Sequence, residues 1–242
     1  MSVVKRRPDE AAQLPLHLPH EASFARDDFL VADCNRAAFE LVERWPDWPS
    51  KLVVLAGPTG SGKSHLADIW RERTGGTVVS ADALSRTDPL RLVEAGAIAI
   101  EDADGATGSA GRCDDTALFH LLNAARAAGA HVLITCRHWP EAWGIQLADL
   151  KSRLRAATPV EIGEPDDDLI RRVLVKLFAD RQISIDAAVV NYLLVRMERS
   201  LATASRLVAE LDREALARGR AVTRPIAADV LARLSHGNGT EL

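Results

Sequence analysis

The chain has 242 residues, of which 47% are hydrophobic and 26% are charged, a composition that excludes an intrinsically disordered or collagen-like protein. The 30 Lys and Arg residues are outnumbered by 34 Asp and Glu residues, and a net charge of -4 disfavours binding duplex DNA by bulk positive charge. The three cysteines, Cys34, Cys113 and Cys136, lack the spacing of a disulfide framework or a zinc site. Because the chain also has no apolar run long enough to span a bilayer and no secretory signal, we expect a cytoplasmic protein with no membrane partner.

The first part of the chain alternates strands and helices. Prolines predict an extended tail over residues 1–21, and apolar residues at helical spacing predict a helix from about Cys34 to Trp45. Five short apolar runs predict buried strands, at Lys51–Ala56, Gly76–Ser80, Ala97–Glu101, His131–Thr135 and Pro159–Ile162, with helices between them at His65–Arg73 and Asp115–Ala128. This alternation over residues 22–163 predicts an α/β core with a parallel sheet flanked by helices.

After Glu164 and Pro165 the pattern becomes helical throughout. Four amphipathic stretches predict helices, at Asp166–Arg181, Asp186–Met197, Leu201–Arg218 and Pro225–Leu234. We therefore expect an all-helical C-terminal domain over residues 164–235, followed by a frayed end at 236–242.

The strongest motif follows the strand at Lys51–Ala56. It fits the pattern G-x-x-x-x-G-K-[ST] with the residues Gly57, Pro58, Thr59, Gly60, Ser61, Gly62, Lys63 and Ser64. In such a loop the backbone N–H groups surround a phosphate chain, the lysine contacts the β- and γ-phosphates, and the final hydroxyl binds Mg²⁺. Because the motif lies between a predicted strand and a predicted helix, as this chemistry requires, it predicts the binding of ADP or ATP with Mg²⁺.

Two acids end the strand at Ala97–Glu101. In P-loop nucleotidases an acid at the end of a neighbouring strand holds Mg²⁺, and the next acid can polarise the attacking water. Glu101 would then be a metal ligand with Ser64, and Asp102 would be catalytic. The usual order is Asp and then a longer acid, so the reversed lengths predict slow hydrolysis, and Asp104 is an alternative acid.

The order of four features along the chain resembles that of AAA+ ATPases of the DnaA type. These features are the phosphate loop, the acid pair, the strand His131–Thr135 and the segment Asp149–Leu154. The resemblance covers about residues 12–235 and implies a P-loop AAA+ core with a C-terminal helical lid. The tail segment Gln13–Leu18 resembles the clamp-binding hexapeptide of the Hda family of DnaA-related regulators. That family is normally ADP-bound, docks on the sliding clamp of DNA polymerase and stimulates ATP hydrolysis by DnaA, which prevents re-initiation of replication.

The resemblance assigns roles to three further parts of the chain. In an extended tail, Leu14, Leu16 and Leu18 would fill apolar pockets of the clamp while Gln13 makes polar contacts. Arg153 matches the arginine finger, which would act in trans on a nucleotide held by DnaA, and Thr135 matches the sensor at the end of a core strand. The resemblance implies a bacterial, replisome-associated protein, with self-association left open.

Two departures accompany the resemblance. The lid arginine that faces the phosphates in this family falls on Ala202, with Arg199 and Arg206 about one turn to either side. We therefore expect an AAA+ ATPase fold with weak hydrolysis of its own. The chain shows no helix-turn-helix after Leu234, so we expect no direct sequence-specific DNA binding.

Two other functions share the phosphate loop. A helicase loader-like AAA+ ATPase has the same core but no reason to carry a clamp peptide. A small-molecule P-loop kinase needs a phosphoacceptor pocket and a lid inserted within the core, whereas the helical region here follows the core.

Overall fold

The computed structural model describes residues 25–105 and 111–237. It contains a five-stranded parallel sheet in the order β2-β3-β4-β1-β5. The strands are β1 (Leu52–Ala56), β2 (Thr77–Ser80), β3 (Ala97–Glu101), β4 (His131–Cys136) and β5 (Thr158–Glu161). The predicted α/β core is confirmed, with strand ends that differ from the predicted ones by at most one residue.

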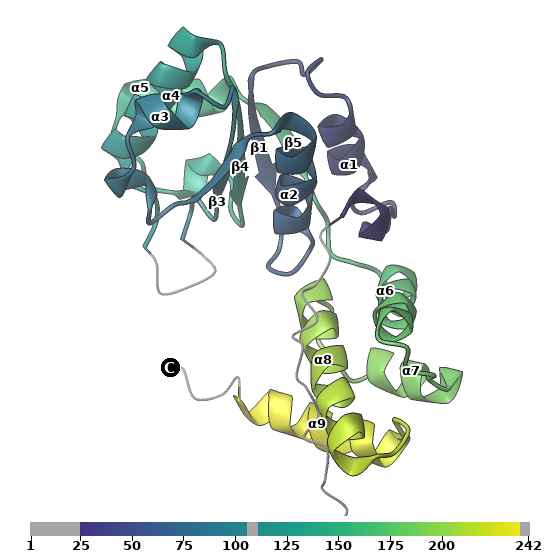
Figure 1. Ribbon diagram of the computed structural model, residues 1–242. Coiled ribbons are helices and arrows are strands. Elements are labelled where there is room, and N and C mark those ends of the chain that lie inside the picture. Colours follow the sequence, from purple (N-terminus) through teal and green to yellow (C-terminus); the bar gives the residue numbers. More distant parts are fainter. Residues whose placement is uncertain (1–24, 106–110, 238–242) are drawn as a thin grey trace, which may run out of the picture.

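Helices cover both faces of this sheet (Figure 1). On one face lie α1 (Arg36–Glu43) and α2 (Lys63–Thr74), and on the other lie α3 (Pro89–Val93), α4 (Asp115–Ala128) and α5 (Ala148–Arg155). Alternate residues of each strand supply the two cores: Val54, Ile98 and Ile134 pack on the α4 side, while Val53, Ala99 and Leu133 pack on the α2 side. A sheet that is buried on both faces explains why its strands are continuous apolar runs.

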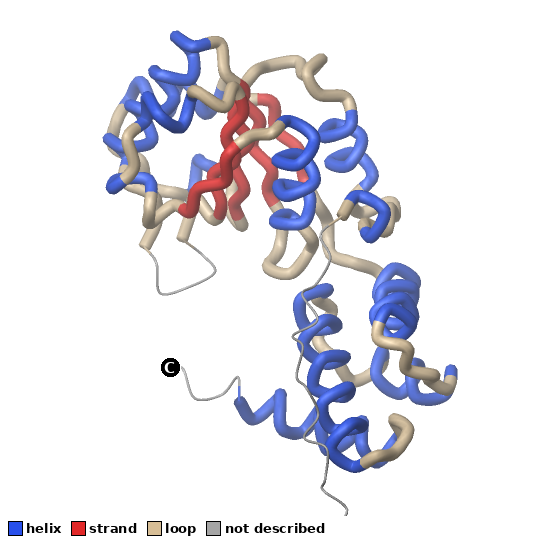
Figure 2. The backbone as a smooth tube through the Cα atoms, viewed as in Figure 1, coloured by secondary structure: helices blue, strands red, loops and turns tan. Residues whose placement is uncertain are grey.

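The helical domain comprises α6 (Asp167–Asp180), α7 (Ala187–Leu194), α8 (Leu201–Arg218) and α9 (Arg224–Gly237). It has its own apolar core, which includes Leu174, Phe178, Leu193 and Leu207. In Figure 2 these helices lie beyond the end of the sheet where the loop between β1 and α2 is found. The helical domain, or lid, therefore lies next to the loop between β1 and α2.

Candidate functional site: a phosphate loop closed by a helical lid

The loop Gly57–Ser64 connects β1 directly to α2, as its motif requires. Gly60 and Gly62 have φ values of +73° and +105°, which residues with a side chain rarely adopt. The Lys63 side chain crosses the loop, and its Nζ donates to the carbonyl oxygens of Gly57 and Pro58, each at 2.8 Å. Burial lowers the pKa of Lys63, while the carboxylate of Asp102 acts in the opposite direction. A phosphate chain in this loop would therefore meet a buried ammonium group.

The acids at the end of β3 lie beside this loop. The hydroxyl of Ser64 donates to the carboxylate of Glu101, so the two residues predicted to bind Mg²⁺ are adjacent. Burial is the larger effect on this carboxyl and raises the pKa of Glu101. One carboxylate oxygen of Glu101 and the hydroxyl of Ser61 are buried and have no hydrogen-bond partner in the structure. These orphaned groups fit a phosphate–Mg²⁺ ligand, because Mg²⁺ in nucleotide sites takes few protein ligands and completes its shell with phosphate and water.

Asp102 and Thr135 are joined across neighbouring strands. The N–H of Asp102 donates to the Thr135 hydroxyl at 3.1 Å, and Asp102 has a φ of +51°, in the left-handed region. Thr135 is buried at the end of β4, between the strand that leads to the phosphate loop and the strand that ends in the acid pair. The hydrogen bond holds the backbone of Asp102 in its unusual conformation, next to the phosphate loop.

Asp104, the alternative acid, is hydrogen-bonded to the turn that follows β4. Its Oδ2 accepts hydrogen bonds from the backbone N–H groups of Arg137 and His138, at 3.0 and 2.7 Å. These hydrogen bonds fix the turn after β4, while the other carboxylate oxygen, Oδ1, is buried and has no hydrogen-bond partner in the structure. Asp102, unlike Asp104, is among the described residues that line the pocket beside the loop.

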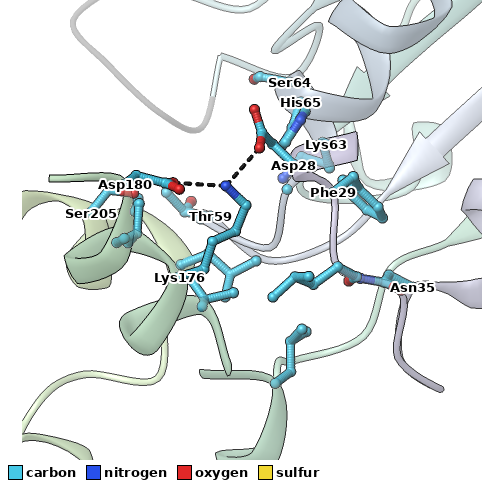
Figure 3. Close-up of a pocket in the computed structure, with 18 of the residues that line it drawn as sticks. Asp28, Phe29, Asn35, Thr59, Lys63, Ser64, His65, Lys176, Asp180 and Ser205 are labelled. Carbon is cyan, nitrogen blue, oxygen red and sulfur yellow. Dashed lines mark hydrogen bonds and ion pairs between the residues drawn. The ribbon is translucent and has the colours of Figure 1, made fainter. Parts of the chain in front are cut away.

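A pocket of about 380 Å³ opens beside the phosphate loop (Figure 3). Its walls come from the segment before α1, from the loop, and from the lid helices α6 and α8. Lys176 of α6 bridges two of these parts, because its Nζ pairs with Asp28 at 2.6 Å and with Asp180 at 2.7 Å. Phe29 stacks on Phe39 with their ring centroids 5.5 Å apart. Sequence reasoning missed these wall residues, since no motif links positions so far apart in the chain.

The lid touches the phosphate loop itself. The N–H of Leu201 donates to the carbonyl of Gly60 at 2.8 Å, and a Cβ placed on Gly60 would lie 3.1 Å from the Cβ of Ala202. Ala202 therefore does lie against the loop, but it carries only a methyl group. Arg199 is paired with Asp167 at 3.1 Å, and neither Arg199 nor Arg206 is among the pocket-lining residues of the described chain.

Arg153 lies at the opposite end of the sheet. It lines a second pocket together with Lys51, Leu52 and Val132, which lie within one residue of the starts of β1 and β4. Because all strands are parallel, this end is the one away from Lys63. The Arg153 guanidinium is 5.4 Å from the centroid of the Phe119 ring on α4. The structure therefore separates Arg153 from the other predicted catalytic residues.

Other predictions remain untested by the structure. Gln13, Leu14, Leu16 and Leu18 of the tail lie outside the described residues. Within the described chain, no group of three or more His, Cys, Asp or Glu side chains could hold a metal ion by itself. No helix in that part of the chain has the length and apolar character needed to cross a bilayer.

Comparisons with solved structures relate the whole fold to DnaA. Domain III of DnaA from Thermotoga maritima is 18% identical, with a TM-score of 0.70, over 87% of this chain and 96% of that one. AMPPCP-bound DnaA from Aquifex aeolicus is 18% identical, with a TM-score of 0.62, over 78% of this chain and 64% of that one.

Comparisons of sequence give shorter or weaker matches. A tRNA dimethylallyltransferase from Cereibacter sphaeroides is 48% identical over 65 residues, which is 26% of this chain and only 21% of that enzyme. The chain thus matches about a fifth of the length of this relative. An uncharacterized protein of Haemophilus influenzae is 26% identical over 231 residues, which is 90% of this chain and 98% of that protein.

The helical domain has a family match of its own. Residues 166–231 match the model of the Hda lid domain, and this range spans α6, α7, α8 and the first part of α9. Together with the AAA+ fold shared with DnaA domain III, this match makes the chain similar to DnaA-related AAA+ proteins of the Hda type.

Proposed function

We propose that this chain is a nucleotide-binding AAA+ regulator that docks on the sliding clamp of DNA polymerase and stimulates ATP hydrolysis by DnaA. It would thereby act against re-initiation of replication, as a cytoplasmic, replisome-associated protein. The Hda lid match and the DnaA-like fold support the choice of DnaA as the partner. The tail segment Gln13–Leu18 supports the choice of the clamp.

One observation carries the proposed action on DnaA. Arg153 lies at the end of the sheet away from Lys63, so it is poorly placed to contact a nucleotide in its own phosphate loop. Its guanidinium is half-buried over Phe119, and no carboxylate of the described chain pairs with it. An arginine supplied to a neighbouring subunit can stabilise the charge that develops on the transferred phosphoryl group.

The chain's own nucleotide would then have a structural role. Lys63 and the loop backbone would hold the phosphates of ADP or ATP, and Ser64 and Glu101 would hold Mg²⁺, which screens the phosphate charge. At the position of the family's lid arginine the chain places only the methyl group of Ala202 against the loop, so that particular cation is missing. We therefore propose weak hydrolysis by the chain itself, with Asp102 as the acid nearest to the phosphates.

The action on DnaA is tested by measuring ATP hydrolysis by DnaA in the presence of the clamp on DNA. Arg153→Ala should abolish the stimulation, because an arginine finger contributes about 1000-fold or more to the rate. Its own ADP binding should persist, because Arg153 is far from Lys63. Arg155→Ala is the matched control, since Arg155 is an exposed arginine of the same helix. Full stimulation by the Arg153→Ala variant would contradict the proposed role.

The tail is tested by a pull-down on the clamp. Replacing Gln13 and Leu14 with Ala should abolish retention, because a short extended peptide depends on a few side chains that enter pockets. His17→Ala is the control, since alternate residues of an extended peptide point to opposite sides. Retention of the double variant at wild-type strength would remove the clamp from the proposal.

A helicase loader-like ATPase and a small-molecule P-loop kinase are the competing functions. The short match to tRNA dimethylallyltransferase covers 26% of this chain, whereas the likeness to DnaA domain III covers 87%. Binding to a helicase without binding to the clamp would favour the loader. Stabilisation of the protein by a phosphoryl-accepting substrate such as a nucleoside or a sugar would favour the kinase.

A further inference from the structure

The second pocket of the molecule has a volume of about 300 Å³ and lies between α4, α5 and the starts of β1 and β4. Buried residues that include Leu122, Ala125 and Val132 form an apolar floor. Three cations also line it: Lys51, Arg126 and Arg153. We call this cavity the basic pocket.

The charges of the basic pocket are unbalanced. None of its lining residues is acidic, and within the described chain none of the three cations pairs with a carboxylate. Lys51 donates to the carbonyl of Gly129 at 2.8 Å, and Arg153 lies over the Phe119 ring. By contrast, Arg218 and Arg233 share the carboxylate of Glu214, at 2.6 Å each. Several cations beside an apolar floor form a site of positive potential that favours an anion carried on an apolar body.

The position of the basic pocket indicates which molecule supplies that anion. A partner whose nucleotide is reached by Arg153 must lie against the same end of the sheet, where the basic pocket lies. Residues of that partner would therefore face Lys51 and Arg126. Opposite potentials across an interface accelerate encounter and fix its orientation.

We propose that the basic pocket binds an acidic side chain and a neighbouring apolar side chain from the nucleotide-binding face of DnaA. Lys51 and Arg126 dock the partner, and Arg153 is thereby directed at the partner's phosphates. The inference rests on the proposed function and adds a docking site to it. A second copy of this chain is the competing occupant, because the segment before α1 in its own nucleotide region carries the exposed carboxylates of Asp27 and Asp33.

The experiment measures how the stimulation of ATP hydrolysis by DnaA depends on the concentration of this protein. Arg126→Glu and Lys51→Glu should each raise the half-maximal concentration about tenfold or more, and the maximal stimulation should persist. This pattern differs from that of Arg153→Ala, which should remove the maximal stimulation. Because the docking is electrostatic, the effect of Arg126→Glu should shrink as salt is raised from low ionic strength.

Two further variants make the test specific. Arg220→Glu is the matched control, since it reverses an exposed arginine of the lid that forms no ion pair within the described chain. Ala156→Trp adds a large side chain to the lining of the pocket without changing any charge, and it should also raise the half-maximal concentration. ADP binding and thermal unfolding of each variant check that the fold is intact.

Three outcomes would overturn the inference. If Arg126→Glu and Lys51→Glu behave like Arg220→Glu while Arg153→Ala remains inactive, the docking site is wrong and the proposed function stands. If the two reversals abolish self-association in sedimentation but leave the stimulation unchanged, the occupant is a second copy of the chain. If the wild-type protein gives no stimulation, the proposed function itself fails, and the docking site fails with it.

Discussion

The two ends of the β-sheet hold their cations in opposite settings. At the end that carries the phosphate loop, Lys63 is buried and donates to two loop carbonyls, and Lys176 is held between two carboxylates. At the other end, Lys51, Arg126 and Arg153 surround an apolar floor without an acid among the residues that line it. The cations at the phosphate-loop end interact with groups of their own chain. Those at the other end have no carboxylate among the pocket residues and can pair with an anionic group of another molecule.

This difference has a functional meaning. A cation that is satisfied by its own chain is held rigidly and serves a ligand bound in that chain. A cation without a carboxylate partner can form an ion pair with a neighbouring molecule at little cost in free energy, because no internal ion pair must first be broken. The sheet thus separates the residues that hold a nucleotide from those that can act on a partner, and substitutions at the two ends should have separable effects.

The largest expected effect is the loss of nucleotide binding at one end only. Lys63→Ala removes the buried ammonium that faces the phosphates, and we expect its affinity for ADP to fall about 100-fold or more. Lys51→Ala removes a lysine at the other end, and ADP affinity should stay within about twofold of wild type. Isothermal titration calorimetry measures both. Equal losses in the two variants would show that the two ends are not independent.

A smaller effect is expected where the lid meets the loop. A Cβ on Gly60 would lie 2.1 Å from the hydroxyl of Ser200, which caps α8 by accepting from Thr203. Gly60→Ala should therefore lower the free energy of unfolding by about 2–3 kcal/mol, through the left-handed backbone and the displaced cap. Gly75→Ala is the control, because Gly75 also has a positive φ but no atom lies within 4 Å of its Cβ.

Urea unfolding measures the two glycine variants. The control should lose only about 1 kcal/mol, which is the cost of the positive φ alone. If both variants lose the same amount, the contact between lid and loop contributes nothing to stability. Gly60→Ala should also weaken ADP binding, whereas Gly75→Ala should leave it unchanged.

The acid beside the loop gives a pH-dependent prediction. Burial raises the pKa of Glu101 in the folded state, so the native protein binds this proton more tightly than the unfolded chain does. The stability that this group contributes is present below its unfolded pKa, near 4.5, and is lost as the pH rises through the folded pKa. Glu101→Gln should therefore melt at a higher temperature than the wild type at neutral pH, and the difference should shrink toward pH 4.5.

The same variant should lose function while it gains stability. Without the Glu101 carboxylate, the enhancement of ADP binding by Mg²⁺ should fall about tenfold. Glu94→Gln is the control, because Glu94 is an exposed carboxylate away from the loop. A Glu101→Gln variant that keeps the full response to Mg²⁺ would remove this residue from the proposed metal site.

The sequence predicts best the elements whose signals are local. The helices at Asp115–Ala128 and Leu201–Arg218 have the predicted bounds, because side-chain caps at Asp114 and Ser200 begin them and left-handed glycines end them. No helix is predicted for α5, which has eight residues and whose N-cap residue, Leu147, provides no side-chain cap. The phosphate loop is equally predictable from the sequence, because the strand, the glycines and the lysine are contiguous.

Long-range contacts were not predictable in the same way. The ion pair between Asp28 and Lys176 joins residues that are far apart in the sequence, and no local sequence pattern around either residue predicts the contact. The sequence shows that Arg153 belongs to a motif, but only the parallel sheet shows that it lies at the end away from Lys63. The basic pocket combines segments around Lys51, Arg126 and Arg153, and their proximity depends on the same topology.

The smallest expected effect concerns the lid arginines beside Ala202. Arg199 is exposed and pairs with the exposed Asp167, an arrangement that contributes at most about 1 kcal/mol to stability. Neither it nor Arg206 lines the pocket of the described chain, so Arg199→Ala and Arg206→Ala should bind ATP and ADP with wild-type affinities. Ala202→Arg is the informative counterpart, because it restores a cation on the face of α8 that meets Gly60. If either alanine variant lowers the affinity for ATP relative to ADP, the lid moves an arginine to the phosphates when nucleotide binds. The nucleotide-binding end of the sheet would then gain a cation from the lid only in the bound state.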